Sequence, residues 1–336
     1  MAGKINLIIY GCGVMGRRIV QALSSKDRFE IVGAVDVDEE LAGKDLGNFL
    51  DPPKKLGVKI EHDADKLFSE VKADAVVLTT TSYLENIHPQ IFQCIEAGLN
   101  VISTSEELSF PWKRSPDRAK KIDDLAKEKG VTVVGTGINP GFLMDTLPLV
   151  LTGPCLKVDS VRVVRMMNSA QRRIPFQKKV GTGLTRDEFE EKIEKKIITG
   201  HVGLLESVYM IADGLGWELE EVRELPPEPA IADRELTTGM GTVKVGDVMG
   251  LVSVAFGKKN GEKVINLEFN AHAGVKDEYD EIYIQGEPDI HEKILGGVHG
   301  DIGTVAVTIN TIVNAVQASP GLKITKDLPP AVVVTQ

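Results

Sequence analysis

The hydrophobic pattern of the first 140 residues alternates between two kinds of segment. Continuous apolar runs are typical of strands buried on both faces of a sheet, and apolar residues three or four positions apart are typical of amphipathic helices. The pattern predicts strands at 5–10, 31–36, 75–80, 100–103 and 131–135, and helices at 14–23, 89–97 and 115–129. Strands that alternate with helices in this way predict an α/β domain built on a doubly wound parallel sheet.

The pattern changes after Pro140, where strands follow one another and helices stand apart from them. This grouping predicts a second, α+β domain with a mainly antiparallel sheet. A last helix is apolar at helical spacing and is long enough to pack back onto the first domain. We therefore expect one domain over 1–140, which 301–336 rejoins, and another over 141–300. The elements predicted here are strands at 158–167 and 281–285, helices at 185–196, 204–215 and 301–318, and a hairpin of 248–256 with 264–271 around an Asn-Gly turn.

The composition narrows the class of protein. The 336 residues carry 39 Lys and Arg against 49 Asp and Glu, a formal net charge of −10. A nucleic-acid-binding protein instead needs clustered basic residues that neutralise phosphates. No apolar run approaches the roughly 18 residues that span a bilayer, and no secretory signal pattern opens the sequence. The three cysteines are too sparse for a disulfide framework or a zinc site. We expect a cytoplasmic protein that binds no nucleic acid, membrane or metal.

A glycine-rich motif follows the first predicted strand and opens the first predicted helix. In that context the first glycine permits a tight turn, the second lets the backbone approach a pyrophosphate, and the third allows the helix to pack closely on the strand. About 20 residues further on, the carboxylate of Asp36 is placed to accept hydrogen bonds from a ribose diol. A glycine turn with a surface aspartate is the alternative, but the context favours a Rossmann-type dinucleotide site. The motif residues are Gly11, Cys12, Gly13, Val14, Met15 and Gly16.

The residues after Asp36 favour NAD over NADP as the cofactor. Acidic residues at 38–40 add negative charge, and no Arg or Lys adjoins Asp36 to pair a 2′-phosphate. Arg17 and Arg18 keep NADP possible, because the first turn of the helix also reaches phosphate groups.

Polar residues follow three other predicted strands, at the sheet edge where ligands of such folds bind. The loop after residue 135 combines glycines and a proline with the amide of Asn139. Two carboxylates, Glu106 and Glu107, follow the strand that ends at 103, and we expect one of them to be catalytic. A charged first helical turn, which the helix dipole also favours, is the alternative for this pair. Cofactor contacts are expected from Thr80, Thr81, Ser103, Thr104 and Asn139.

Several segments together resemble the 2,4-diaminopentanoate dehydrogenase family and the related native amine dehydrogenases, which share the broad architecture of dihydrodipicolinate reductase. The resemblance implies oxidative deamination of a primary amine to a ketone with release of ammonia, and 2-amino-4-oxopentanoate as the physiological product. It also implies use of NAD or NADP, a catalytic glutamate at Glu106 or Glu107, a second domain that closes over the substrate, and a homodimer. The segments that carry it are 100–107, 135–141, 200–203, 246–250 and 302–304.

The chemistry of amine oxidation indicates which further residues matter. Hydride leaves a carbon that bears nitrogen only when that nitrogen is a neutral amine, so a base must hold the proton. A partly buried glutamate suits this task because desolvation raises its pKa. We expect substrate contacts from Asn139 and from His201, which lies between two glycines. Arg165 or Asn168 is expected to pair with a substrate carboxylate. Thr304, at the start of the last helix, is a further expected contact. A histidine without a role and a solvated strand face are the alternatives.

Two other functions compete with amine oxidation. The first is a dihydrodipicolinate reductase-like activity, but the sequence has neither the His-His pair nor the Pro-Ser-Gly-Thr segment of that enzyme. The second is a non-catalytic NAD-binding sensor, which would keep the glycine motif and Asp36 but need neither glutamate nor Asn139. The sequence also does not distinguish between three classes of amine substrate: a diamino acid, an ornithine-like compound and a plain alkyl amine.

Overall fold

The computed structural model describes residues 3–335, which divide into two compact units. Unit 1 runs up to Phe142 and resumes at Gly300, and unit 2 is Leu143–His299. The C-terminal segment of the chain therefore belongs to the same unit as the N-terminal segment.

Unit 1 is built on a seven-stranded sheet in the order β16-β6-β5-β4-β1-β2-β3. Every pairing between these strands is parallel, which confirms the predicted doubly wound sheet. Since the strands are parallel, their carboxyl ends meet at one edge. The strands are β1 (Ile5–Tyr10), β2 (Phe29–Val35), β3 (Ile60–Glu61), β4 (Ala75–Leu78), β5 (Asn100–Ser103), β6 (Thr132–Gly135) and β16 (Gly321–Lys323).

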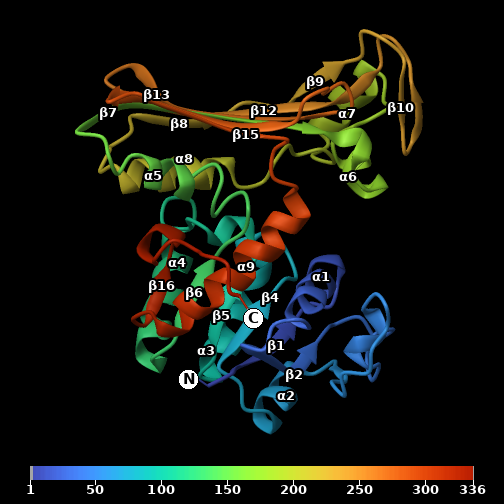
Figure 1. Ribbon diagram of the computed structural model, residues 1–336, viewed down its shortest axis with the longest axis vertical. Helices are drawn as coiled ribbons and strands as arrows, with labels where there is room; N and C mark the ends of the chain where they lie inside the picture. The colour runs from blue at the N-terminus through green and yellow to red at the C-terminus, as the bar shows by residue number, and fades with distance from the viewer. Residues whose placement is uncertain (1–2, 336) are drawn as a thin grey trace. The chain divides into compact units, whose positions relative to one another are not determined.

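Helices cover both faces of this sheet (Figure 1). Because side chains alternate along a strand, Leu7 of β1 packs with α1 and α9 in one apolar cluster, and Ile8 packs with α2, α3 and α4 in the other. The C-terminal helix α9 thus packs on the first domain, as predicted. The helices are α1 (Val14–Leu23), α2 (Ala64–Glu70), α3 (Leu84–Glu96), α4 (Pro116–Lys129) and α9 (Gly300–Gln317), with short turns η1 (Leu46–Phe49), η2 (Glu106–Leu108) and η4 (Thr325–Asp327).

One predicted boundary in unit 1 is wrong. The sequence predicts a helix that starts at Pro89, whereas α3 starts at Leu84 and carries Pro89 in its interior. The proline removes one backbone donor. The apolar stripe continues through Leu84, Ile87 and Ile91, all buried against the sheet, so burial of this face outweighs the lost hydrogen bond.

Unit 2 contains a second seven-stranded sheet, in the order β15-β14-β7-β13-β12-β8, with β9 also paired to β12. Helix α8 packs on β12, β13 and β8, and α5 packs on α8. The strands are β7 (Lys157–Asn168), β8 (Glu221–Glu224), β9 (Glu228–Ile231), β12 (Val248–Lys259), β13 (Glu262–His272), β14 (Tyr279–Glu287) and β15 (Ile290–Leu295), beside a separate pair of β10 (Leu236–Thr238) and β11 (Gly241–Val243). The helical segments are η3 (Ser169–Gln171), α5 (Thr146–Leu151), α6 (Ile174–Lys179), α7 (Arg186–Glu194) and α8 (Leu204–Gly214).

The second sheet is mainly antiparallel, as predicted, with one exception. β7 and β13 run parallel and place Asn168 opposite His272. The antiparallel hairpin β12–β13 turns at Asn260 and Gly261, whose φ angles of 53° and 79° are those that an Asn-Gly hairpin turn requires. The capping signal at Thr185 is also confirmed, because its side chain and that of Glu188 bond to each other's backbone amides.

Candidate functional site

The glycine-rich turn between β1 and α1 is fixed by close backbone contacts. Gly11 has a φ of +99°, and a Cβ on Gly16 would lie 1.9 Å from the carbonyl oxygen of Gly11. Only glycine fits at these two positions. A Cβ on Gly13 would meet nothing within 4 Å, so the middle glycine borders open space at the N-terminus of α1. This is the arrangement in which a phosphate group can approach backbone amides.

Asp36 follows β2 and is tied to the same turn. Its Oδ2 accepts a hydrogen bond of 2.5 Å from the backbone nitrogen of Cys12, and its Oδ1 accepts one of 2.9 Å from that of Asp38. Burial, followed by the charge of Asp36, raises the pKa of the Cys12 thiol to about 12. Cys12 therefore contributes its backbone to this turn and keeps an uncharged thiol.

The side chains of the first turn of α1 differ in exposure. Val14 is 53% exposed, and Met15 packs against the apolar cluster of α1 and α9. The two arginines that follow have protein partners. Arg17 donates from Nε to the Cys12 carbonyl at 2.7 Å and lies 3.9 Å from the ring centre of Phe49, and Arg18 pairs with Asp301 at 3.6 Å.

The end of β4 lies beside the glycine-rich turn, because the chain switches sides of the sheet between β1 and β4. The hydroxyl of Thr79 donates to the Gly11 carbonyl at 2.8 Å. Thr79 therefore supports the turn, a role that the sequence did not predict. Thr80 donates to Gln90 at 2.5 Å, and Thr81 accepts from the backbone of Tyr83 at 3.4 Å.

The end of β5 holds the two candidate glutamates on the short turn η2. The backbone of η2 lies against β6, where a Cβ on Gly135 would come within 2.5 Å of Leu108. Just before the turn, the Thr104 amide donates to the Leu78 carbonyl at 3.1 Å, and the buried Ser103 hydroxyl donates to the same carbonyl at 3.0 Å. These bonds fix the turn at the carboxyl edge of the sheet.

Glu107 is engaged by structural partners. Its Oε2 accepts from the backbone nitrogen of Leu84 at 2.8 Å, which satisfies one free amide at the start of α3. Its Oε1 pairs with Arg114 at 3.4 Å. Glu106 is half-buried on the same turn. The contacts of Glu107 give it a structural role that the sequence left open.

The end of β6 completes this edge. Asn139 is 7% exposed in the buried loop that follows β6. The Thr136 amide donates to the Ser103 carbonyl at 2.8 Å, and the Ile138 amide donates to the hydroxyl of Thr304 in α9 at 3.4 Å. The structure therefore brings Thr304 and the Asn139 loop together, as well as β5 and β6.

In unit 2, Arg165 is buried and pairs with Asp280. Their side chains are 3% and 5% exposed, and Arg165 Nε lies 3.4 Å from Asp280 Oδ1. Arg165 also donates to the Val298 carbonyl, while Asp280 Oδ2 accepts from the Val298 amide at 2.7 Å. Burial raises the pKa of Asp280, and the charge of Arg165 opposes that rise. The solvated face considered for Arg165 is therefore wrong, because the strand face that carries this residue is covered.

Asn168 stabilises a loop. Its Oδ1 accepts from the backbone of Ala170 at 2.9 Å, and its Nδ2 donates to the Val275 carbonyl at 2.9 Å. Two histidines of this unit lie at or beside β13: the predicted contact His201, and His272 at the end of the strand. His201 stacks on Phe269 with ring centres 4.3 Å apart, and burial lowers the pKa of His272.

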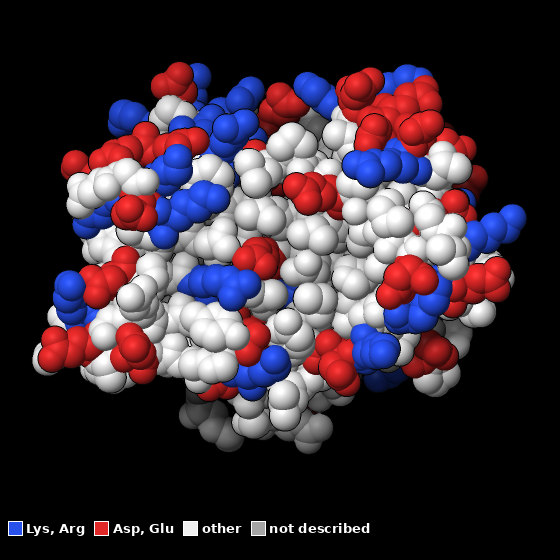
Figure 2. Space-filling view, turned by 90° about the horizontal axis from the view of Figure 1, so that it is seen from above, with Lys and Arg blue, Asp and Glu red and all other residues white. Residues whose placement is uncertain are grey.

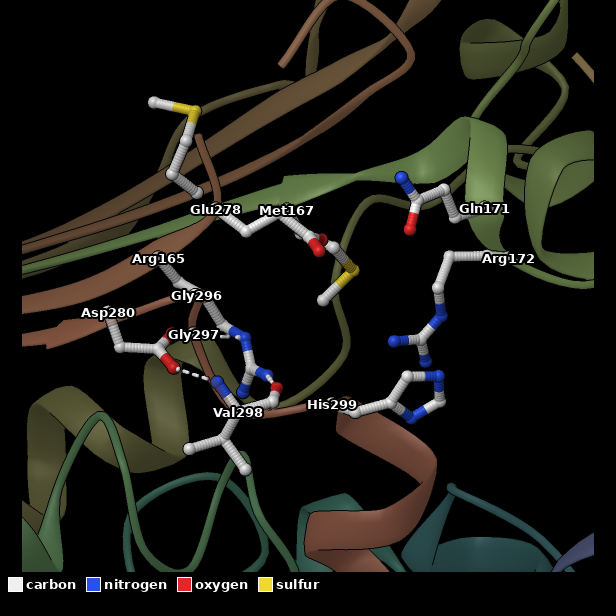
Figure 3. Close-up of a pocket in the computed structure, with 11 residues that line it drawn as sticks. Arg165, Met167, Gln171, Arg172, Glu278, Asp280, Gly296, Gly297, Val298 and His299 are labelled. Atoms are coloured by element: carbon white, nitrogen blue, oxygen red, sulfur yellow. Dashed lines mark hydrogen bonds and ion pairs between the residues drawn. The ribbon is translucent and has the colours of Figure 1, made fainter. Parts of the chain in front are cut away.

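A small cavity of about 120 Å³ lies at the end of β7 in unit 2. Figure 3 shows Arg165, Asp280 and Val298 on one side of it and Arg172 and His299 on the other. Apart from Arg165, sequence reasoning missed the polar lining. The lining comes from β7, η3, β14 and the segment 296–299, and no local motif links segments so far apart in sequence.

The carboxyl edge of unit 1 fits a dinucleotide cofactor. The open space at Gly13, the exposed start of α1 and the fixed carboxylate of Asp36 are the features such a cofactor requires. Across residues 3–335, no group of three or more His, Cys, Asp and Glu side chains is arranged to hold a metal ion. Within the same residues, no helix is both long and apolar enough to cross a membrane.

The fold and this edge define the class of protein: an oxidoreductase that uses NAD(P), with a Rossmann-type unit and a second unit on a mixed sheet. Residues 142–336 match the model of the 2,4-diaminopentanoate dehydrogenase C-terminal domain, and residues 5–136 match that of the dihydrodipicolinate reductase N-terminus. The chain belongs to the 2,4-diaminopentanoate dehydrogenase family.

Individual relatives agree with this membership. The chain is 35% identical to 2,4-diaminopentanoate dehydrogenase of Acetoanaerobium sticklandii over 97% of its length and 94% of that protein. It is 23% identical to an amine dehydrogenase of Streptomyces virginiae over 97% and 96% of the two chains. Among solved structures, amine dehydrogenase from Mycobacterium smegmatis superposes with a TM-score of 0.84 at 25% identity, covering 98% of this chain and 97% of that one.

Proposed function

We propose that this protein catalyses the NAD(P)-dependent oxidative deamination of 2,4-diaminopentanoate to 2-amino-4-oxopentanoate, with release of ammonia. The observation that carries the proposal is a carboxylate pair at the end of β5, on the same sheet edge as the glycine-rich turn. The substrate is inferred from the relative with 35% identity over nearly the whole chain. The reverse reaction is the reductive amination of a ketone.

The reaction requires proton transfer at two stages. The substrate ammonium group must first lose a proton. The carbon bonded to that nitrogen then gives up a hydride, which NAD(P)⁺ would accept. Water adds to the resulting iminium carbon and loses a proton, and ammonia leaves after its nitrogen gains one. The balance is amine, water and NAD(P)⁺ giving ketone, ammonium and NAD(P)H. A single half-buried carboxylate is able to carry these protons in both directions.

We assign this proton transfer to Glu106 and a positioning role to Glu107. The assignment rests on the partners of Glu107, whose two oxygens hold the Leu84 amide and Arg114. A carboxylate whose two oxygens secure the start of a helix and a guanidinium is committed to structural contacts, which suits a positioning role. Glu107 instead keeps η2 in place against α3.

The remaining predicted residues receive roles by position. We propose that Asn139 and Thr304, joined through the Ile138 amide, contact both the substrate and the nicotinamide. Arg165 and His201 are proposed substrate contacts from unit 2. Asn168 is proposed to act indirectly, since its side chain bonds to the loop around it. The cofactor contacts proposed are the backbone of residues 11–16, Asp36, Thr80, Thr81, Ser103 and Thr104.

NAD is the proposed preferred cofactor. The Asp36 carboxylate is fixed at the end of β2 by the Cys12 and Asp38 amides, so a 2′-phosphate placed there would lie against an acidic side chain. Arg17 donates from Nε to a backbone carbonyl, and Arg18 pairs with Asp301. Neither arginine adjoins Asp36 in sequence.

The proposed function is tested with the purified protein and a panel of amines. We expect NADH formation and stoichiometric ammonia from 2,4-diaminopentanoate, with a higher kcat/KM than from ornithine or a plain alkyl amine. Higher activity on an alkyl amine would overturn the substrate assignment. Cofactor binding without oxidation of any amine would support the sensor instead.

We also propose that the protein acts in the cytoplasm as a homodimer. The thiols of Cys12, Cys94 and Cys155 are all free, which suits a reducing compartment. The proposed dimer surface is the face of the unit 2 sheet that points away from α8. In Figure 2 uncharged side chains occupy much of the middle of this face.

Several charged groups on this face pair with one another. Arg162 bonds to Glu268 at 3.0 and 3.3 Å, and Glu281 pairs with His291 at 2.8 Å and with Lys293 at 3.3 Å. A face on which charged groups are paired suits contact with a second copy of itself, where like charges would otherwise meet. Light scattering of the wild type should give the mass of a dimer. Val254→Glu on this face should give a monomer, and Val245→Glu, on a loop of the same unit, should not.

A further inference from the structure

The cavity at the end of β7 is lined by charged groups, of which Arg172 and Glu278 have no role in the function proposed above. It is lined by residues of unit 2 and measures about 120 Å³, far below the volume of a site for a drug-sized ligand. Two guanidinium groups and two carboxylates line it, a mixed-charge lining that suits a small zwitterion better than a simple anion or an apolar group.

One wall is rigid and nearly neutral. Each carboxylate oxygen of Asp280 contacts a protein group: Oδ1 pairs with Arg165, and Oδ2 accepts a hydrogen bond from the Val298 amide. Arg165 gives one donor to the Val298 carbonyl, and its guanidinium has other donors to offer. This wall therefore presents fixed N–H groups.

The other groups supply one charge of each sign. Arg172 follows η3, and Figure 3 shows its guanidinium directed into the space beside His299. Glu278 holds the Asn168 amide with Oε1 at 2.7 Å. In the part of the chain that the structure describes, its Oε2 has no such bond, so it is available to a donor on a ligand.

We propose that this cavity binds the α-amino-acid head group of the substrate and that Arg172 determines specificity for it. The proposal rests on the function proposed above. In 2,4-diaminopentanoate the amine on C4 is oxidised, whereas the carboxylate of C1 and the ammonium on C2 remain unchanged. A guanidinium pairs with a carboxylate through two parallel hydrogen bonds. Arg172, assisted by Arg165, thus recognises the carboxylate, and Glu278 accepts from the ammonium.

Two substrate analogues separate these contacts. Pentane-2,4-diamine keeps both amines and has a methyl group where the substrate has its carboxylate. 4-Aminopentanoate keeps the carboxylate and lacks the amine on C2. Each charge of the head group can therefore be removed from the substrate as well as from the protein, with KM and kcat measured by NADH formation.

We expect Arg172→Met to raise KM for 2,4-diaminopentanoate and 4-aminopentanoate by about 10- to 100-fold, the loss typical of a charged hydrogen-bonding partner. KM for pentane-2,4-diamine should stay within about threefold of wild type, because this substrate has no carboxylate. The kcat values for the three substrates should change as little. A tenfold change corresponds to about 1.4 kcal/mol. Arg172→Lys, which keeps the charge but not the planar fork, should recover part of the loss.

Glu278→Gln should show the complementary pattern. Gln can still accept from the Asn168 amide, but it lacks the charge that pairs with the ammonium on C2. We expect KM to rise for 2,4-diaminopentanoate and pentane-2,4-diamine and to remain unchanged for 4-aminopentanoate.

Arg173→Met is the matched control, because it removes the same charge from the neighbouring residue, which is exposed and does not line the cavity. It should leave all three KM values unchanged. The proposal is overturned if Arg172→Met raises KM equally for all three substrates or for none. If the wild type oxidises none of the three, the proposed function itself fails, which is a different result from the loss of discrimination.

Discussion

The sheet edge of unit 1 and the cavity of unit 2 are built in opposite ways. The edge of unit 1 is held mainly by contacts of backbone groups. The main chains of Gly11 and Gly16 lie in close contact, and the Asp36 carboxylate accepts a hydrogen bond from the Cys12 amide. In the cavity of unit 2, side chains from four separate segments meet, and a buried ion pair holds the Val298 backbone.

This difference decides how each region responds to change. A site made of backbone depends on the space available around each Cα, so adding one methyl group is enough to disturb it. A site made of buried charges depends on its ion pairs, because removing one charge leaves the other unpaired in the poorly solvating protein interior. The two regions therefore call for different substitutions.

The largest effect on stability is expected in unit 2. Arg165→Met leaves Asp280 buried without its cation and should reduce the free energy of unfolding by about 3–5 kcal/mol. The double variant Arg165→Met/Asp280→Leu removes both charges and should recover most of this loss. Urea unfolding of the single and double variants tests the claim. A single variant as stable as wild type would show that this region does not depend on its ion pair.

A smaller effect is expected from one methyl group in unit 1. A Cβ on Gly16 would overlap the Gly11 carbonyl, so Gly16→Ala should cost about 1–3 kcal/mol of stability and abolish cofactor binding. Gly13→Ala meets open space and should leave the melting temperature unchanged, yet weaken NADH binding if a pyrophosphate approaches there. Thermal melts with and without NADH separate the two. Equal destabilisation by both variants would contradict the backbone account.

The smallest effect concerns the one side chain at the unit 1 edge whose charge should matter for the cofactor. Asp36→Asn keeps an acceptor for the Cys12 amide and removes the negative charge. We expect the ratio of kcat/KM for NAD to that for NADP to fall by about tenfold, since a 2′-phosphate is no longer repelled. Glu39→Gln, further along the acidic run, is the control. A wild type that prefers NADP would refute the proposed preference outright.

Much of unit 1 could be predicted from the sequence because its signals are local. The apolar run of β1, the glycines that follow it and Asp36 lie within a short stretch of chain, and periodicity alone locates α1. The start of α3 was misplaced because a proline normally opens a helix, whereas here burial of Leu84, Ile87 and Ile91 extends the helix before Pro89.

The site in unit 2 could be predicted only in part. Arg165 was identified as a candidate, but its partner Asp280 is far away in sequence, and no pattern links either of them to the Val298 backbone. The roles of Glu106 and Glu107 were also beyond the sequence. Adjacent residues share every local signal, and the contacts of Glu107 with Leu84 and Arg114 arise from tertiary structure.

The central claim is that Glu106 carries the protons of amine oxidation while Glu107 maintains the turn. The direct test is kcat for 2,4-diaminopentanoate with Glu106→Gln and Glu107→Gln, with NADH affinity measured in parallel. Glu106→Gln should lower kcat by about 10²- to 10⁴-fold without changing NADH binding. Glu107→Gln should lose less than about tenfold, because Gln still accepts from the Leu84 amide. A greater loss of kcat in Glu107→Gln, or near wild-type turnover in Glu106→Gln, would contradict the account.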